Sequence, residues 1–272
     1  MNRLLGCLLL ALTSVVSAEE LLDRRVDPAL LEVYRPALFE DDGFQLPYRL
    51  LRPEGASEAD PRPLLVYLHG YGAGGSNNQT QLVVSAALFA SEGFQKGRRP
   101  FVLMPQCPSR SIAGKDQPHT WPTLSSTQGE WEIADLDAGY SQPLLAVRRL
   151  VDRLIASQPI DSSRLYVTGV SMGGYGSWEL AAREPEFWAA AVPICGKGKP
   201  EWGAQLAKLP IWSFHGDADD DEFVHHERRL IAAIRAAGGK PIYTEFAGVG
   251  HNAWPPTAAN QHVWDWLFAQ RR

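Results

Sequence analysis

The sequence has few cysteines, no excess of positive charge and neither an internal repeat nor a low-complexity tract. Its formal net charge of −5 excludes the basic surface typical of nucleic-acid-binding proteins, so we expect no nucleic-acid partner. The three cysteines lack the spacing of a zinc site. The chain has 272 residues, 45% of them hydrophobic and 21% charged, which fits a globular protein with a sizeable core. This composition excludes a chain that is disordered, collagen-like or coiled-coil throughout.

Residues 1–18 have the pattern of a secretory signal peptide. Arg3 gives the positive start, Leu4–Leu12 the apolar run, and Val16–Ala18 the small residues of a cleavage site. The apolar run is too short to span a bilayer, so we expect a secreted or periplasmic protein without stable membrane insertion. The alternative is a lipoprotein cleavage box at Leu4–Cys7, which would lie unusually early because no apolar segment precedes it.

Removal of this segment would take away Cys7 and leave Cys107 and Cys195. An even number of cysteines in an exported protein permits one disulfide. Each of the two also follows a predicted buried strand, where a free thiol is common. The sequence leaves both alternatives open.

After residue 60 the chain alternates short apolar runs with helical patterns. The apolar runs, which we predict to be buried strands, are Leu64–Leu68, Phe101–Met104, Leu165–Thr168, Ala189–Ile194, Ile211–Phe214 and Ile242–Phe246. The helical patterns cover Leu82–Ala90, Leu144–Ala156 and residues 173–183, 223–237 and 258–269. Repeated strand–helix units predict an α/β protein with a mostly parallel central sheet and helices on both faces.

Two segments depart from this alternation. Leu30–Glu40 and Phe44–Arg52 flank Asp41-Asp42-Gly43, a hairpin signal that predicts antiparallel strands at the N-terminal edge of the sheet. Residues 105–130 are rich in proline and form the longest stretch without a regular pattern. A loop of this length in a compact domain is more often functional than idle. Nothing indicates a second domain, so we expect a single domain over residues 19–272.

Residues 169–173 read Gly-Val-Ser-Met-Gly, which matches G-x-S-x-G. A predicted strand precedes them and a predicted helix follows, and this context projects the Ser171 hydroxyl above the edge of the sheet. It also places a helix N-terminus near developing negative charge. Ser171 is therefore the candidate nucleophile. The alternative is a glycine-rich turn with an idle serine.

A serine hydroxyl is a weak nucleophile unless a base accepts its proton. Folds with this turn place the partners in the chain order serine, acid, histidine. Asp219 lies just beyond the strand Ile211–Phe214, and His251 lies just beyond Ile242–Phe246. Since the carboxyl ends of parallel strands share one edge of the sheet, we expect Ser171, Asp219 and His251 to meet there as a catalytic triad.

Other ionisable residues surround the candidate acid. Asp217 lies closer to the strand end and is expected to cap the turn, while Asp220 and Asp221 begin the next predicted helix. His215 is interpreted as a structural residue that holds this acidic turn.

The remaining histidines are weaker candidates. His225 and His226 lie on a predicted helix, where a solvated face is expected, and His262 is expected on the surface of the last helix. His119 lies in the long loop. The alternative is a metal site formed by His225, His226 and the neighbouring acidic run.

An oxyanion hole needs two backbone N–H groups aimed at the substrate carbonyl. We expect one from Met172, which follows the serine, and one from Tyr71, in the loop after Leu64–Leu68. His69 is interpreted as stabilising this loop. Residues 70–75 also satisfy G-x-G-x-x-G, but the next strand ends without the acid that a dinucleotide site requires.

These motifs resemble those of the α/β-hydrolase superfamily. More narrowly, the chain is similar to secreted esterases of the dienelactone-hydrolase and polyhydroxybutyrate-depolymerase-like kind and to serine hydrolases of the prolyl-oligopeptidase type. The matching pieces are residues 68–70, 104–108, 169–174, 193–196, 215–219 and 248–251. The resemblance implies the α/β-hydrolase fold, and it implies Asp219 as the acid because in such relatives the acid closes an H-G-x-x-D run. One departure is the longer acidic run after Asp219, where relatives often have an apolar residue and proline.

The residues and the resemblance together imply a secreted serine hydrolase that cleaves a small-molecule or polymer ester without a metal or organic cofactor. A serine peptidase with the same triad is one alternative, and a catalytically silent binding module is another. Four aromatic residues either line a pocket for an aryl or sugar group or are packing residues: Tyr71, Trp121, Tyr175 and Trp254.

Overall fold

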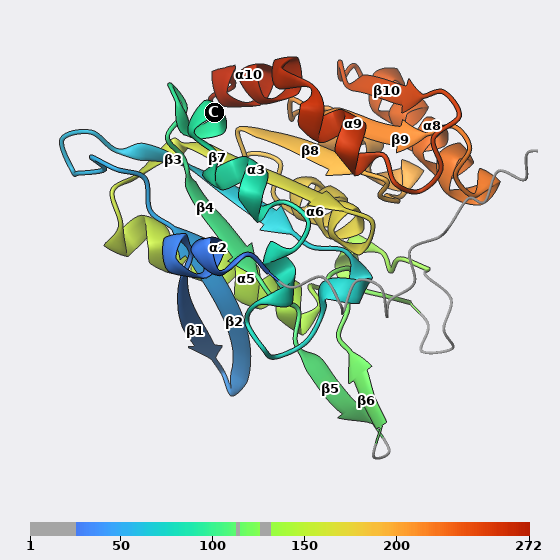
Figure 1. The fold of residues 1–272 in the computed structure, drawn as a ribbon. Coiled ribbons are helices and arrows are strands. Elements are labelled where there is room, and N and C mark those ends of the chain that lie inside the picture. The colour runs from blue at the N-terminus through green and yellow to red at the C-terminus, as the bar shows by residue number, and fades with distance from the viewer. Residues whose placement is uncertain (1–25, 113–114, 126–131) are drawn as a thin grey trace, which may run out of the picture.

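A computed structural model describes residues 26–112, 115–125 and 132–272 (Figure 1). Its central sheet has the strand order β1-β2-β4-β3-β7-β8-β9-β10. The strands are β1 (Arg35–Asp41), β2 (Phe44–Leu51), β3 (Arg62–Leu68), β4 (Phe101–Pro105), β7 (Ile160–Val170), β8 (Ala190–Ile194), β9 (Trp212–Gly216) and β10 (Ile242–Phe246). The pairs β1–β2 and β2–β4 are antiparallel, and the other pairs are parallel. The predicted fold class, with its antiparallel N-terminal edge, is confirmed.

Helices cover both faces of the sheet because its inner strands are apolar on both sides. Leu64, Val66 and Leu68 of β3 pack in one core cluster, and Leu65 and Tyr67 pack in the other. The first cluster includes side chains of α5 (Gln142–Ser157), α6 (Met172–Arg183), α7 (Gly203–Leu206) and α8 (Asp221–Ala236). The second includes side chains of α3 (Ala86–Ala90), α4 (Glu92–Gln95), α9 (Trp254–Ala259) and α10 (Gln261–Ala269) (Figure 1).

Two expected helices are interrupted. The segment predicted as one helix over Leu82–Ala90 consists of a 3-10 turn, η2 (Thr80–Leu82), followed by α3. The last predicted helix is divided into α9 and α10 at Asn260, whose side chain accepts a hydrogen bond from the His262 N–H at 3.1 Å. Asparagine is a favoured N-cap, so a second helix begins there.

The N-terminal hairpin forms where predicted, but its first strand begins later. Pro28–Val33 is a helix, α2, instead of the start of a strand. Asp27 caps this helix by accepting a hydrogen bond from the Ala29 N–H at 2.9 Å, and proline fits the first helical position. Asp42 and Gly43 at the hairpin turn have φ angles of 47° and 78°, the left-handed conformation that a two-residue turn needs.

The segment from residue 105 to 130 is not irregular throughout, contrary to the prediction. It contains a short antiparallel hairpin, β5 (Ser109–Ile112) with β6 (Lys115–Pro118), which projects from the body of the molecule (Figure 1). The chain then returns to the core, where Trp121 is fully buried.

Cys107 and Cys195 are buried free thiols, so the disulfide alternative is wrong. Cys107 follows β4 and Cys195 follows β8, and β3 and β7 lie between these strands. Three strand spacings amount to about 14 Å, whereas a disulfide joins Cα atoms about 4.4–6.8 Å apart. The Cys107 thiol instead donates to the His119 carbonyl at 3.1 Å.

The expected signal peptide, residues 1–18, lies outside the described residues, as do Cys7 and the alternative lipoprotein box. Among the helices that the structure describes, none is long and apolar enough to cross a membrane.

Candidate functional site

Ser171 lies on the sharp turn between β7 and α6. Its φ and ψ angles are 56° and −120°, a conformation that L-residues rarely adopt. The glycines of the motif make this turn sterically feasible: a β-carbon at Gly173 would lie 1.8 Å from the Leu68 carbonyl oxygen, and one at Gly169 would lie 2.4 Å from the Gly173 carbonyl oxygen. The Ser171 N–H donates to the Ile194 carbonyl at 2.9 Å, which fixes the turn against β8.

His251 lies in the loop after β10 and connects the serine to a carboxylate. Its Nε2 is 2.7 Å from Ser171 Oγ, and its Nδ1 is 2.8 Å from Asp219 Oδ2. A carboxylate only accepts hydrogen bonds, so Nδ1 carries the proton and Nε2 is left to accept the serine hydroxyl. The three residues that sequence reasoning selected therefore lie in one hydrogen-bonded row.

The Asp219 turn, between β9 and α8, crosses the His251 loop at close range. A β-carbon at Gly216 would lie 2.0 Å from the Val249 carbonyl oxygen, so the two segments can pass only because residue 216 is glycine. Asp217 strengthens the crossing, because its Oδ1 accepts the Gly248 N–H at 2.6 Å.

Among the aspartates of this turn that the structure describes, Asp219 is the one that is hydrogen-bonded to His251. Asp220 instead caps α8 by accepting the Glu222 N–H at 2.9 Å, and Asp221 is the first residue of that helix. These positions agree with the sequence-based prediction that Asp217, Asp220 and Asp221 serve the turn and the helix.

The Asp219 carboxylate is strongly held in its ionised form. Burial alone would raise its pKa, but hydrogen bonds from His215 and His251 outweigh burial and hold the pKa well below its usual range. Its Oδ1 also accepts the Asp220 N–H at 2.8 Å. The carboxylate is therefore charged at neutral pH.

His215 contacts the same Asp219 oxygen as His251, as expected for a residue that holds the acidic turn. Its Nε2 is 2.9 Å from Asp219 Oδ2, and its Nδ1 contacts Glu227 Oε2 on α8. The His215 and Glu227 side chains are both fully buried. Burial would lower the pKa of His215, but hydrogen bonds that its ring donates to the two carboxylates raise it to about 9.

Glu227 is a residue that sequence reasoning missed. It lies on the buried face of α8 with Val224, Leu230, Ile231 and Ile234. A glutamate within an apolar helical stripe is an unusual pattern, since an ionisable side chain is seldom fully buried unless it is paired. That pattern is the signal that could have found it.

The expected oxyanion groups flank Ser171. Met172 is the first residue of α6, where backbone N–H groups have no partner within the helix. On the other side, a β-carbon at Gly70 would lie 3.7 Å from Ser171 Cβ, so the loop after β3 runs beside the serine. Tyr71 follows at the start of a 3-10 turn, η1 (Tyr71–Ala73), with 46% of its surface exposed.

Buried hydrogen bonds hold the loop after β3. The Cys107 N–H donates to His69 Nε2 at 2.9 Å, and Trp121 Nε1 donates to the His69 carbonyl at 3.0 Å. Burial lowers the pKa of His69 to about 4, so the imidazole is neutral and can accept at Nε2. His69 therefore stabilises the loop, as predicted, rather than acting as a second base.

Three of the four aromatic candidates for a pocket are packing residues. Trp121 is fully buried, while Tyr175 and Trp254 are 4% and 6% exposed. Trp254 Nε1 donates to the Val84 carbonyl at 3.2 Å. Tyr71 remains the aromatic side chain of this set that faces outward.

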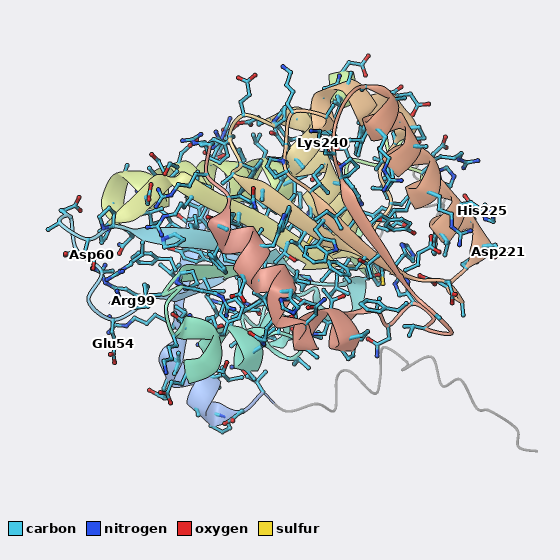
Figure 2. The ribbon with its side chains drawn as sticks, turned by 90° about the horizontal axis from the view of Figure 1, so that it is seen from above. Glu54, Asp60, Arg99, Asp221, His225 and Lys240 are labelled. Atoms are coloured by element: carbon cyan, nitrogen blue, oxygen red, sulfur yellow. The ribbon has the colours of Figure 1, made fainter. Side chains whose placement is uncertain are left out.

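Three further histidines, all on or near the surface, make no hydrogen bond or ion pair with the triad within the described residues. His225 and His262 are exposed and His226 is half-buried; Figure 2 shows His225 and Asp221 at the outer edge of the molecule. Within the described residues, one group could offer three ligands to a metal ion: Cys195, His215 and Asp219. This group does not include the alternative ligands His225 and His226.

The geometry of that group does not suit a metal. Both ring nitrogens of His215 already face carboxylates. Burial raises the pKa of the Cys195 thiol to about 12, so the thiolate that a metal would require is disfavoured. The cluster is better described as part of the hydrogen-bonded network around Asp219.

The chain is similar to several known proteins. Residues 137–260 match the model of the dienelactone hydrolase family. A stretch of 134 residues, 49% of this chain, is 31% identical to poly(3-hydroxyalkanoate) depolymerase C of Paucimonas lemoignei and covers 28% of that protein. A solved thermostable esterase is 34% identical, with a TM-score of 0.79, over 90% of this chain and 64% of its own.

A more distant structural neighbour is dipeptidyl peptidase 4 of Porphyromonas gingivalis. It is 11% identical with a TM-score of 0.61, and the match covers 87% of this chain and 35% of the peptidase. This likeness concerns the fold alone. The chain spans less than half the length of the curated relatives it matches. The chain thus has the α/β-hydrolase fold, and it is similar to esterases and, over residues 137–260, to the dienelactone hydrolase family.

Proposed function

We propose that the chain is an exported serine hydrolase that cleaves carboxylic esters through Ser171, His251 and Asp219. The observation that carries the proposal is the row of hydrogen bonds from Ser171 Oγ through His251 to Asp219, at 2.7 and 2.8 Å. The expected signal peptide at residues 1–18 is the reason for proposing a secreted or periplasmic location.

In the acylation step, Ser171 Oγ attacks the carbonyl carbon of the ester while its proton passes to His251 Nε2. The carbonyl oxygen becomes an oxyanion, which the N–H groups of Met172 and Tyr71 stabilise in this proposal. His251 then gives its proton to the departing alkoxide, which leaves as an alcohol. The acyl group remains on the serine oxygen.

In the deacylation step, water takes the place of the serine. His251 accepts a proton from the water as it attacks the acyl carbon, and the tetrahedral intermediate forms again. Collapse returns the proton to Ser171 Oγ and releases the carboxylic acid. Throughout the cycle Asp219 keeps the proton on His251 Nδ1 and stabilises the imidazolium.

Two features favour esters over peptides. Esters need less activation of the leaving group than amides do. The sequence relatives are a depolymerase and an esterase, whereas the peptidase likeness is confined to the fold. We therefore expect turnover of p-nitrophenyl acetate and butyrate at rates at least 100-fold above those of peptide p-nitroanilides.

The test compares two serine variants on activated esters. Ser171→Ala removes the proposed nucleophile and should lower kcat by about 10⁴ or more. Ser177→Ala is a matched control, because this buried hydroxyl of the same helix donates to the Gly173 carbonyl at 2.7 Å and does not reach His251. Turnover of Ser171→Ala within tenfold of the parent would contradict the proposal.

A substrate panel then narrows the ester class. Acyl chains of increasing length, feruloyl esters, acetylated sugars and 3-hydroxyalkanoate oligomers should be compared by kcat/KM. A depolymerase-like enzyme should prefer the oligomers, and a simple carboxylesterase should prefer short acyl chains.

A further inference from the structure

The hydrogen-bonded row does not stop at Asp219. Asp219 Oδ2 faces two histidines, with His251 Nδ1 at 2.8 Å and His215 Nε2 at 2.9 Å. Beyond His215, Nδ1 contacts Glu227 Oε2. The five side chains from Glu227 to Ser171 thus form one continuous chain, and His215 and Glu227 at its inner end have no exposed side-chain surface.

The protons on the two ring nitrogens of His215 can be assigned from the carboxyl groups that the nitrogens contact. His215 stands between two carboxyl groups, and ionised carboxylates only accept hydrogen bonds. The proton between His215 Nδ1 and Glu227 can lie on either atom. In both cases Nε2 keeps its own proton and points it at Asp219. Glu227 therefore selects the form of His215 that donates to Asp219.

Fold stability alone is a weak reason to bury this pair. A buried ion pair often contributes no more than well-packed apolar side chains would, while loss of one partner leaves an uncompensated charge. Glu227 occupies a position on α8 where its neighbours on the buried face are aliphatic. Its partner His215 immediately precedes Gly216, the residue that allows the acidic turn to cross the His251 loop.

We propose that His215 and Glu227 are positioning residues for the proposed ester hydrolysis. Glu227 orients His215, and His215 holds the Asp219 carboxylate against His251. The proposal rests on the function assigned above to Ser171, His251 and Asp219. It differs from a purely structural role because the pair acts on the orientation of one carboxylate, so its loss should affect the chemical step more than substrate binding.

The first measurement is a kinetic comparison on p-nitrophenyl butyrate. His215→Leu removes the donor to Asp219 and should lower kcat by about 10- to 100-fold, as expected for one charge-assisted hydrogen bond, with KM within threefold. His215→Gln keeps an N–H near the position of Nε2 and should recover most of the loss. In Glu227→Gln the amide can either accept a hydrogen bond from His215 Nδ1 or donate one to it, so the loss of kcat should be intermediate.

The matched control is Glu184→Gln. Glu184 accepts hydrogen bonds from Tyr140 at 2.6 Å and Arg148 at 2.8 Å, but it lies beyond the far end of α6 from Ser171. This variant should melt at a lower temperature while keeping the parent kcat. It separates a loss of stability from a loss of positioning, and thermal melts of every variant show which of them remain folded.

A second measurement does not depend on turnover. The proton between His251 Nδ1 and Asp219 should give a low-field resonance in the proton NMR spectrum of the resting parent enzyme. It should persist in His215→Gln and Glu184→Gln and should broaden or vanish in His215→Leu, because Asp219 is no longer held in place. If His215→Leu does not fold, the positioning role is tested by comparing kcat and the low-field resonance of Glu227→Gln with those of Glu184→Gln.

The two proposals fail in different ways. If the parent hydrolyses esters but the folded His215 and Glu227 variants keep its kcat within twofold and retain the low-field resonance, the positioning role is wrong. If the parent hydrolyses no ester but the resonance is lost in His215→Leu, the proposed function fails and the positioning of Asp219 stands.

Discussion

Two segments at the carboxyl edge of the sheet each bury a histidine, and burial has opposite outcomes for the charge of the two imidazoles. His69, after β3, meets the Cys107 N–H and the Gly70 carbonyl, so burial prevails and lowers its pKa to about 4. His215, at the end of β9, meets Asp219 and Glu227, which raise its pKa to about 9 despite its burial. Burial alone therefore does not fix the charge of a histidine; the hydrogen-bond partners decide it.

The difference divides the site into a neutral part and a charged part. The loop after β3 holds backbone N–H groups in place by hydrogen bonds among neutral partners. The acidic turn holds ionised groups, where removal of one partner leaves another charge buried. A lost hydrogen bond between neutral groups costs about 1 kcal/mol, and a buried charge without its partner costs several times more. We therefore expect changes in the acidic turn to have the larger effects.

The largest effect is expected from Asp219→Asn. Asparagine keeps the size of the side chain but favours the wrong tautomer of His251, which costs about 10⁴ in kcat in the well-studied serine proteases. Asp217→Asn and Asp220→Asn should each lose less than tenfold, because these residues bond to Gly248 and to the start of α8. The kcat values of the three variants on one activated ester test this. A large loss at Asp217 or Asp220, with Asp219→Asn nearly unaffected, would contradict the assignment of the acid.

A smaller effect is expected from Trp121→Phe in the neutral part. This change removes the N–H that donates to the His69 carbonyl, and one such bond is worth about 1 kcal/mol, or roughly a fivefold loss in kcat. Trp264→Phe is the control, since this buried indole donates to the Ala258 carbonyl at 3.2 Å in the other core cluster. The control should lower the melting temperature only. Equal kcat for the two variants would mean that Trp121 does not support the oxyanion loop.

The last effect is on stability and not on kcat: stability should change with pH, with opposite sign for the two histidines. The pKa of His215 rises from 6.5 to about 9 on folding, so its stabilising contribution is complete below pH 6.5 and is lost as the pH rises through 9. The pKa of His69 falls from 6.5 to about 4, so its contribution is lost as the pH falls from 6.5 towards 4.

Melting temperatures between pH 4 and 10 measure both contributions. Relative to the parent, His215→Gln should reduce the fall of the melting temperature at alkaline pH by a few degrees, and His69→Gln should reduce its fall at acid pH. If both variants reduce the fall on the same side, the contrast between the two segments is wrong.

Features that depend on chain order and local pattern could be predicted from the sequence. The six apolar runs from Leu64 onward became strands of the sheet, and the inner ones are apolar without interruption because they are buried on both faces. The prediction of burial was wrong for Ile242–Phe246, which forms the edge strand β10 and has no buried residue. Ser171, Asp219 and His251 each follow one of these strands, and parallel strands bring such positions to one edge.

Features that depend on which elements pack together could not be predicted from the sequence. The pairing of Glu227 with His215 requires α8 to lie over the end of β9, and the sequence alone does not give that register. The free state of Cys107 and Cys195 follows from strand order, since β3 and β7 lie between β4 and β8. The hairpin β5–β6 lies in a segment whose prolines obscure the alternation of a strand.

The most direct test of the account is covalent labelling with a fluorophosphonate, followed by peptide mass spectrometry. Such reagents phosphonylate an activated serine hydroxyl and leave ordinary serines unmodified. The account predicts one label per chain on the peptide that contains Ser171, the same label in Ser177→Ala, and none in Ser171→Ala. An unlabelled parent protein, or a label that persists in Ser171→Ala, would contradict it.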